Sequence, residues 1–146
     1  MANNTDRKHG WNGEISFAKC NGIRLKNNLI YKKSGKFPLI GGDLSGKYVK
    51  NIVLHHNGFY SSAGAQKVSF EFAGRYLEGI KNLNTYTGHP NFFGKPVFHG
   101  NYSLKGGSFG INRGIKLPAQ LCGTIDLKNH CRTVGRPDLG AFEYQK

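Results

Sequence analysis

A near-repeat of nine residues is the feature that most restricts the fold of this chain. Residues 23–31 (IRLKNNLIY) align without gaps on residues 52–60 (IVLHHNGFY), so that Asn28 matches Asn57 at an offset of 29 residues. Repeats with periods of about 20–50 residues are typical of solenoids, in which each copy forms one coil of a stack. The repeat therefore predicts an all-β chain whose two copies lie on successive coils.

An asparagine holds the same place in both copies. If the copies stack, Asn28 and Asn57 lie one above the other with their side chains pointing inward. A stacked amide donates to one neighbour and accepts from the next, which satisfies polar groups that would otherwise be buried at a cost. We expect these two residues to hold the coils together; the alternative for each is a solvated turn residue.

Other short segments alternate apolar and polar residues, as strands do. Residues 14–17 and 67–72 show this period of two, and Val68, Phe70 and Phe72 share one face that we expect to be buried. Residues 76–80 are expected to form one helical turn. With 21 glycines in 146 residues, the chain has many places at which short segments can turn.

The last third of the chain carries ordered motifs that alternate apolar anchors with Gly and Asn. These motifs are PVF (96–98), NYSLKGGS (101–108), INRG (111–114), DLKNHCR (126–132) and DLGAFEYQ (138–145). Their order and spacing resemble the C-terminal portion of bacterial right-handed parallel β-helix proteins of the pectate-lyase-like superfamily. The resemblance implies a short right-handed parallel β-helix, a solenoid with an irregular C-terminal tail packed on it.

The same resemblance sets the expected organisation of the single domain. Residues 1–13 form an N-terminal cap or a frayed end, residues 14–80 form the coils, and residues 81–146 form the terminal coil and the tail. Catalytic members of the group have more coils, so this chain resembles the terminal part of a larger protein. An uncovered coil end exposes strand edges, so we expect a local cap or self-association into a homo-oligomer there.

The charge of the chain points to an anionic partner. There are 21 Lys and Arg residues against 8 Asp and Glu residues, a formal net charge of +13. Such a field attracts polyanions and speeds their encounter. Acidic polysaccharide is the partner that the resemblance implies. Nucleic acid is less favoured, because the aromatic residues fall on the expected core faces and not between the Lys and Arg residues.

The sequence shows neither a membrane span nor a secretory signal. No window holds eighteen consecutive apolar residues, and residues 1–10 are polar without an apolar core. The family resemblance nevertheless implies an extracellular or cell-surface location.

Four basic residues are the candidate ligand-binding groups. They are Arg24, Lys26, Lys50 and His55. Lys26 aligns with His55 in the repeat, so these two side chains are expected to lie above one another as an anion-binding strip. The alternative is a solvated basic face, since single surface charges are common. Three further basic residues are expected to point outward: Lys32, Lys33 and His56.

The resemblance leaves the question of catalysis open. Uronate lyases of the group need a cation beside the substrate carboxylate and a base for the α-proton, and Lys26, Lys50 or His55 would fill these roles here. No catalytic residue is otherwise indicated, and a non-catalytic binding domain or fragment is the favoured interpretation.

Neither a metal nor a cofactor is expected. His55 and His56 are adjacent, and adjacent strand residues point to opposite faces, so they would not share a metal. Acidic residues do not cluster before the tail, and no Cys-x-x-Cys pair occurs.

The acidic residues of the tail are expected to fix its fold. Asp126, Asp138 and Glu143 are expected to pair with Arg132, with Arg136 or with turn amides. The three cysteines are Cys20, Cys122 and Cys131. The last two could form a disulfide in an oxidising compartment, but three thiols are the favoured reading.

Overall fold

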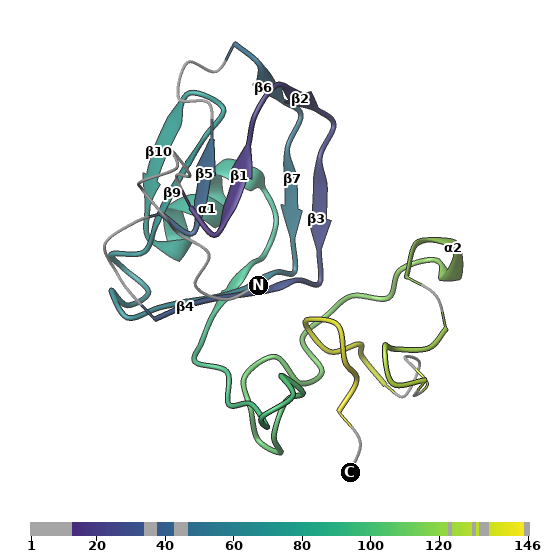
Figure 1. Cartoon of the computed structure of the whole chain (residues 1–146). Helices are drawn as coiled ribbons and strands as arrows, with labels where there is room; N and C mark the ends of the chain where they lie inside the picture. Colours follow the sequence, from purple (N-terminus) through teal and green to yellow (C-terminus); the bar gives the residue numbers. More distant parts are fainter. Residues whose placement is uncertain are drawn as a thin grey trace.

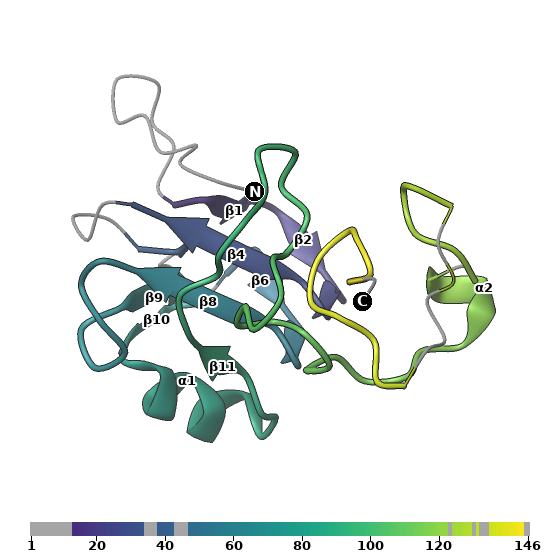
Figure 2. The same ribbon diagram turned by 90° about the horizontal axis from the view of Figure 1, so that it is seen from below.

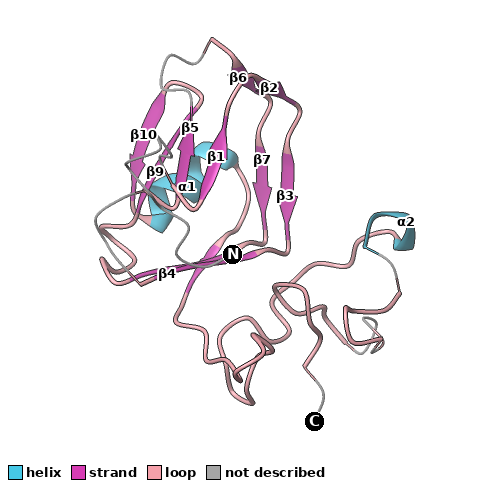
Figure 3. Cartoon of the chain, viewed as in Figure 1, coloured by secondary structure: helices cyan, strands magenta, loops and turns pink. Residues whose placement is uncertain are grey.

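The computed structural model describes residues 13–33, 38–42, 47–122, 124–129, 131 and 135–144. Within these residues short strands predominate and helix is scarce (Figures 1 and 3). The prediction of an all-β chain is therefore confirmed at the level of class. Almost all of the expected N-terminal cap, residues 1–12, lies outside the described residues.

The chain makes two successive passages through the same four strand positions. The first passage contains β1 (Ile15–Phe17), β2 (Cys20–Asn21), β3 (Arg24–Lys26) and β4 (Leu29–Lys32). The second contains β5 (Ile40–Gly42), β6 (Val49–Lys50), β7 (Val53–His55) and β8 (Gly58–Ser61). Every strand of the first passage pairs in parallel with its counterpart in the second. Figure 1 shows these pairs on successive sides of the molecule.

The register of the pairs is the register of the sequence repeat. Leu25 lies opposite Leu54, and Ile30 lies opposite Phe59, each pair 29 residues apart in the sequence. Neighbouring strands of a sheet are separated by about 4.8 Å. Equivalent residues of the two copies therefore lie beside one another.

A third passage is incomplete and contains the longer helix. It consists of β9 (Ser69–Phe72), β10 (Arg75–Glu78), α1 (Ile80–Thr87) and β11 (Phe92–Phe93). β9 pairs in parallel with β5, and β11 pairs in parallel with β8. β10 turns back and pairs antiparallel with β9. Figure 2 shows β4, β8 and β11 side by side, with α1 at the β11 end.

Residues in the left-handed backbone region make the corners between strands. Asn27 has a φ of 57°, Asn51 a φ of 53° and His56 a φ of 53°. Asparagine tolerates this region better than most residues, because its short side chain hydrogen bonds locally. The sequence suggested one strand over residues 23–31; the corner at Asn27 divides it into β3 and β4.

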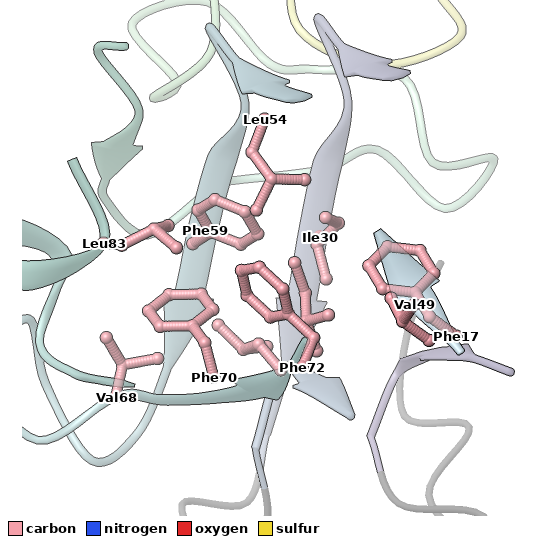
Figure 4. Close-up of a cluster of buried hydrophobic side chains, with 11 residues drawn as sticks. Phe17, Ile30, Val49, Leu54, Phe59, Val68, Phe70, Phe72 and Leu83 are labelled. Carbon is pink, nitrogen blue, oxygen red and sulfur yellow. The ribbon is translucent and has the colours of Figure 1, made fainter. Parts of the chain in front are cut away.

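A single apolar core fills the space between the sheets (Figure 4). Val68, Phe70 and Phe72 are all buried, so the expected buried face of residues 67–72 is confirmed. Phe59 meets Phe70 edge to face, with ring centroids 5.1 Å apart. Complete burial of such a side chain contributes about 1.5–3 kcal/mol, so the core is the main source of stability.

The sequence placed one helical turn at residues 76–80, and that expectation is wrong. Ala73 and Gly74 both have positive φ, 50° and 73°, which is the geometry of a tight two-residue hairpin turn. The hairpin pairs Tyr76 with Glu71 and keeps β10 extended. The helix begins only at Ile80, and its buried Leu83 packs into the apolar core.

The C-terminal residues form an irregular tail that is fastened to the corner at Asn27. The Asn27 side chain donates to the Ile115 carbonyl (2.7 Å) and accepts from the Ile115 amide (2.9 Å). The amide of Gly140 donates to the Asn27 carbonyl at 2.8 Å. The tail also contains the short helix α2 (Ala119–Cys122), which Figure 1 shows away from the strands.

Candidate functional site

A row of hydrogen-bonded asparagine side chains runs across the three passages. Asn28 donates from its side-chain Nδ2 and from its backbone N to Asn57 Oδ1, at 3.1 and 3.0 Å. Asn57 in turn donates from its Nδ2 and its backbone N to Asn91 Oδ1, at 3.0 and 3.1 Å. The contact between Asn28 and Asn57 is the one that the sequence repeat predicts.

The row ends on helix α1. The Asn84 side chain accepts from the Asn91 amide and donates to the Asn91 carbonyl, both at 2.9 Å. This pair of bonds satisfies a donor and an acceptor of Asn91 much as a further strand would. The helix therefore closes the polar row, while Leu83 from its buried face closes the apolar core.

Sequence reasoning missed Asn91 and Asn84, although a signal for the third copy was present. His89-Pro-Asn-Phe-Phe93 repeats the pattern of His55-His-Asn-Gly-Phe59. The offset from Asn57 to Asn91 is 34 residues and not 29, because the β9–β10 hairpin and α1 enlarge the third passage. A search at one fixed period does not find it.

Basic side chains line up beside this row. Lys26 is the strand partner of His55, as the repeat predicts. The ring of His89 stacks on that of His55, with centroids 4.4 Å apart and planes inclined by 25°. Arg24 is exposed and lies two residues before Lys26 on the same strand, hence on the same face. We call Arg24, Lys26, His55 and His89 the basic row.

The other expected basic residues do not join this row. Lys50 is exposed, but it lies on β6 opposite Asn21, in a different sheet. Lys32 was expected to point outward; it is completely buried instead, and its Nζ lies 3.4 Å from the Pro38 carbonyl oxygen. Burial lowers the pKa of Lys32 below its usual 10.5, against the opposing effect of Glu14.

His55 and His56 do not point to opposite faces, so that expectation is wrong. Their ring centroids are only 4.6 Å apart. His56 follows the end of β7 and adopts a φ of 53°, so the alternation of strand side chains no longer applies to it. Its Nδ1 is buried and has no hydrogen-bond partner among the described residues.

The histidine pKa values are lowered. Burial is the largest cause at His55, where the pKa falls below 6.5. The positive groups that lower it further are His56, His89 and Lys26. Burial likewise lowers the pKa of His56, followed by the charges of Arg136 and His89. Both rings are therefore mainly neutral at pH 7 and gain charge only in acid.

The tail carboxylates hold backbone amides. Asp138 is buried and accepts from the amides of Asn112 (2.7 Å) and Tyr144 (2.6 Å). Its pKa is raised because burial outweighs these two bonds. Asp126 accepts from the amides of Lys128 (2.7 Å) and Glu143 (2.9 Å).

Glu143 completes this arrangement, since its Oε2 accepts from the Asp138 amide at 3.2 Å. These contacts correspond to the turn-amide alternative of the sequence. Arg132, the expected charged partner, lies outside the described residues.

Aromatic side chains form a column on the side of β4 and β8 that faces away from the core. The rings of Tyr31 and Tyr60 stack at 5.4 Å with planes inclined by 10°. Tyr60 continues to Phe93 of β11 at 5.8 Å. The sequence placed the aromatic residues on core faces, and these tyrosines are an exception, because Ile30 and Phe59 take the inward positions.

A metal centre is not indicated in the part of the chain that the structure describes, where no group of three or more His, Cys, Asp or Glu side chains could hold an ion. The side chain of Cys122 lies outside that part, so the disulfide alternative with Cys131 is not addressed. Among the described residues, no helix has the length and apolar character needed to cross a membrane.

Comparison of the chain with protein-family models, with curated proteins and with solved structures finds no match. The functional assignment therefore depends on the sequence motifs and on the geometry of the basic row.

Proposed function

We propose that this chain is a short right-handed parallel β-helix of the pectate-lyase-like kind that binds an acidic polysaccharide without catalysis. Three observations support the fold: four parallel strand pairs, a register of 29 residues that matches the repeat, and the shared asparagine row. Right-handedness is the expected sense, because crossovers between parallel strands of one sheet are right-handed in about 98% of cases.

The basic row carries the functional proposal. Lys26, His55 and His89 succeed one another across the passages, with Lys26 and His55 in strand register and the two histidine rings stacked. Strand spacing sets these groups about 4.8 Å apart. A polymer with a carboxylate on each sugar presents its charges at regular intervals, and a regular row of cationic and hydrogen-bonding groups suits it.

Charge and solvation favour weak binding that depends on salt and on pH. Arg24 and Lys26 supply the permanent charge of the row at pH 7. Since the pKa of His55 is lowered, His55 serves there as a neutral hydrogen-bonding group. Below pH 6.5 the histidine becomes charged and attraction to a polyanion increases, provided that the polymer's carboxylates remain ionised.

The experiment is titration of the protein with alginate, pectate and chondroitin, with neutral dextran as the uncharged control. We expect saturable binding to at least one acidic polymer, weakening as salt rises and strengthening between pH 7.5 and pH 5.5. Lys26→Gln should weaken it about threefold to tenfold, since a charge pair of this kind contributes about 0.7–1.4 kcal/mol.

Lys67→Gln is the matched control, because Lys67 is exposed in the turn before β9 and is not part of the row. Equal loss of affinity in both variants would show that net charge, and not the row, drives binding. Tight DNA binding with no binding to any acidic polysaccharide would contradict the proposal in favour of a nucleic-acid partner.

A second candidate function, polysaccharide lyase activity, is supported by one observation. The lowered pKa of His55 leaves a neutral imidazole that can accept a proton, and Lys26 beside it can bind a substrate carboxylate. A rise in ultraviolet absorbance from unsaturated uronate products, lost in His55→Gln, would favour the lyase over the binding domain.

A further inference from the structure

An aromatic pocket lies between β4 and the tail, separate from the basic row. It is a cavity of about 290 Å³ whose walls include Leu29, Tyr31, Phe98, Tyr102, Leu139 and Phe142. Tyr31 and Leu29 come from the side of β4 that faces away from the core. Figure 2 shows the chain after β11 running back across β8 and β4 to this region.

Hydrogen bonds hold each wall of the pocket. Residues 98–104 form a small loop closed by the Phe98–Leu104 bridge and by the bond from the His99 amide to the Ser103 carbonyl (2.9 Å). The C-terminal wall is held by the amide of Leu139, which donates to the Gly110 carbonyl at 2.9 Å. Segments from distant parts of the sequence thus form a defined cavity and not a loose gap.

The rings are set at steep angles to one another. Phe98 stands edge-on to Tyr31 at 87°, with centroids 5.9 Å apart, and meets Tyr102 at 65° and 6.2 Å. One face of Tyr31 is covered by Tyr60. Edge-to-face contacts at these distances are the favoured arrangement for aromatic rings, so a further planar ring in the cavity finds both faces and edges to pack against.

The volume limits the ligand to one ring. A cavity of about 150 Å³ holds a benzene molecule, and this one is about twice as large. Drug-sized ligands commonly occupy 300–1,000 Å³. The pocket therefore accommodates a monocyclic compound with one or two substituents.

Charge near the pocket favours an anion. None of the described lining residues is charged, whereas the Lys128 ammonium lies 5.3 Å from the centroid of the lining ring of Phe142. The net charge of +13 acts in the same sense. A ligand cation would be attracted by the aromatic faces but repelled by Lys128 and by the overall field.

From this geometry we infer that the pocket binds a single planar aromatic ring carrying a carboxylate, with the ring among Tyr31, Phe98 and Tyr102 and the carboxylate toward Lys128. Tyr102 is 68% exposed, so the site can be reached from solvent. This inference is independent of the proposed polysaccharide binding, because the two sites share no residue.

The test is an NMR titration of the full chain with benzoate. We expect saturable shifts of the Tyr31, Phe98 and Tyr102 ring resonances, with a Kd on the order of 1 mM for so small a ligand. Tyr102→Ala should weaken binding about fivefold, Tyr102→Phe should keep affinity within about twofold, and Lys128→Gln should weaken it about threefold. Tyr76→Ala is the matched control, since Tyr76 is 60% exposed on β10 and does not line the pocket.

Two comparison compounds decide the ligand class. Cyclohexanecarboxylate, with equal charge but no aromatic ring, should bind at least threefold more weakly than benzoate, and choline should not bind. Equal binding of cyclohexanecarboxylate, tighter binding of choline, or no saturable shift with benzoate would each overturn the inference. Polysaccharide binding is followed separately through the His55 and His89 resonances, so failure of one proposal does not affect the other.

Discussion

Replacement of the central asparagine, Asn57→Ala, should destabilise the protein more than any other single amide truncation on the coils. Its Oδ1 accepts from the backbone N and the side-chain Nδ2 of Asn28, at 3.0 and 3.1 Å. Its Nδ2 donates to the Leu25 carbonyl at 2.9 Å and to Asn91 Oδ1 at 3.0 Å. Asn57 is completely buried, so water does not replace these partners in the native protein.

Each such bond contributes about 1 kcal/mol net, which sets the loss for four bonds at about 4 kcal/mol. Unsatisfied groups left behind at Asn28 and Leu25 add to it. Since whole domains are stable by about 5–15 kcal/mol, the variant should unfold at a much lower urea concentration. Circular dichroism during urea denaturation measures the change, with the slope of the transition used to check two-state behaviour.

Asn21→Ala provides the matched control. Asn21 is an exposed asparagine of the same passage, and its Oδ1 accepts one printed side-chain bond, from Asn51 Nδ2 at 2.8 Å. Its truncation should cost about 0.5 kcal/mol or less. If Asn57→Ala and Asn21→Ala differ by less than about 1 kcal/mol, the asparagine row does not hold the passages together, and the reasoning is refuted.

Three further predictions concern the helix, the histidines and the tail. Leu83→Ala should lower the free energy of unfolding by about 2–5 kcal/mol, because it opens a cavity where α1 closes the core, whereas exposed Lys81→Ala should change it by less than about 0.5 kcal/mol; similar effects of both would contradict the role of the helix. The lowered pKa of His56 means that the unfolded chain binds protons first as the pH falls through 6.5, so stability should fall in acid, and fall less in His56→Asn; parallel pH profiles of the two proteins, from urea denaturation, would speak against it. Gly114→Ala should loosen the tail by about 1–3 kcal/mol, since a Cβ would lie 2.7 Å from the Pro137 carbonyl oxygen, and should speed proteolysis after residue 100 while Gly100→Ala, with open space around it, should not; equal cleavage rates would refute this.

The parts of the fold that repeat locally were readable from the sequence. Residues 23–31 and 52–60 share one pattern of inward and outward side chains, and this fixed the register of β3 with β7 and of β4 with β8. The inward direction of Phe70 and Phe72 followed from simple alternation. Such patterns persist because each passage buries the same faces against the same neighbours.

Features that depend on backbone geometry and on unequal spacing were not readable. The left-handed corner at His56 brings its ring against His55, and nothing in strand alternation anticipates it. The insertion of β10 and α1 changes the period to 34 residues and hid both Asn91 and His89. Burial of Lys32 is a tertiary effect, since its position among other lysines suggests a solvated turn.

The central claim is that Asn28, Asn57 and Asn91 form one continuous amide row across parallel passages. Proton–proton nuclear Overhauser measurements on the side-chain amides test it most directly in solution. The structure predicts cross-peaks from the Asn57 side-chain amide to the amide protons of both Asn28 and Asn91, together with slow exchange of the Asn57 amide protons with solvent. Cross-peaks to neither partner, with rapid exchange of those protons, would contradict the account.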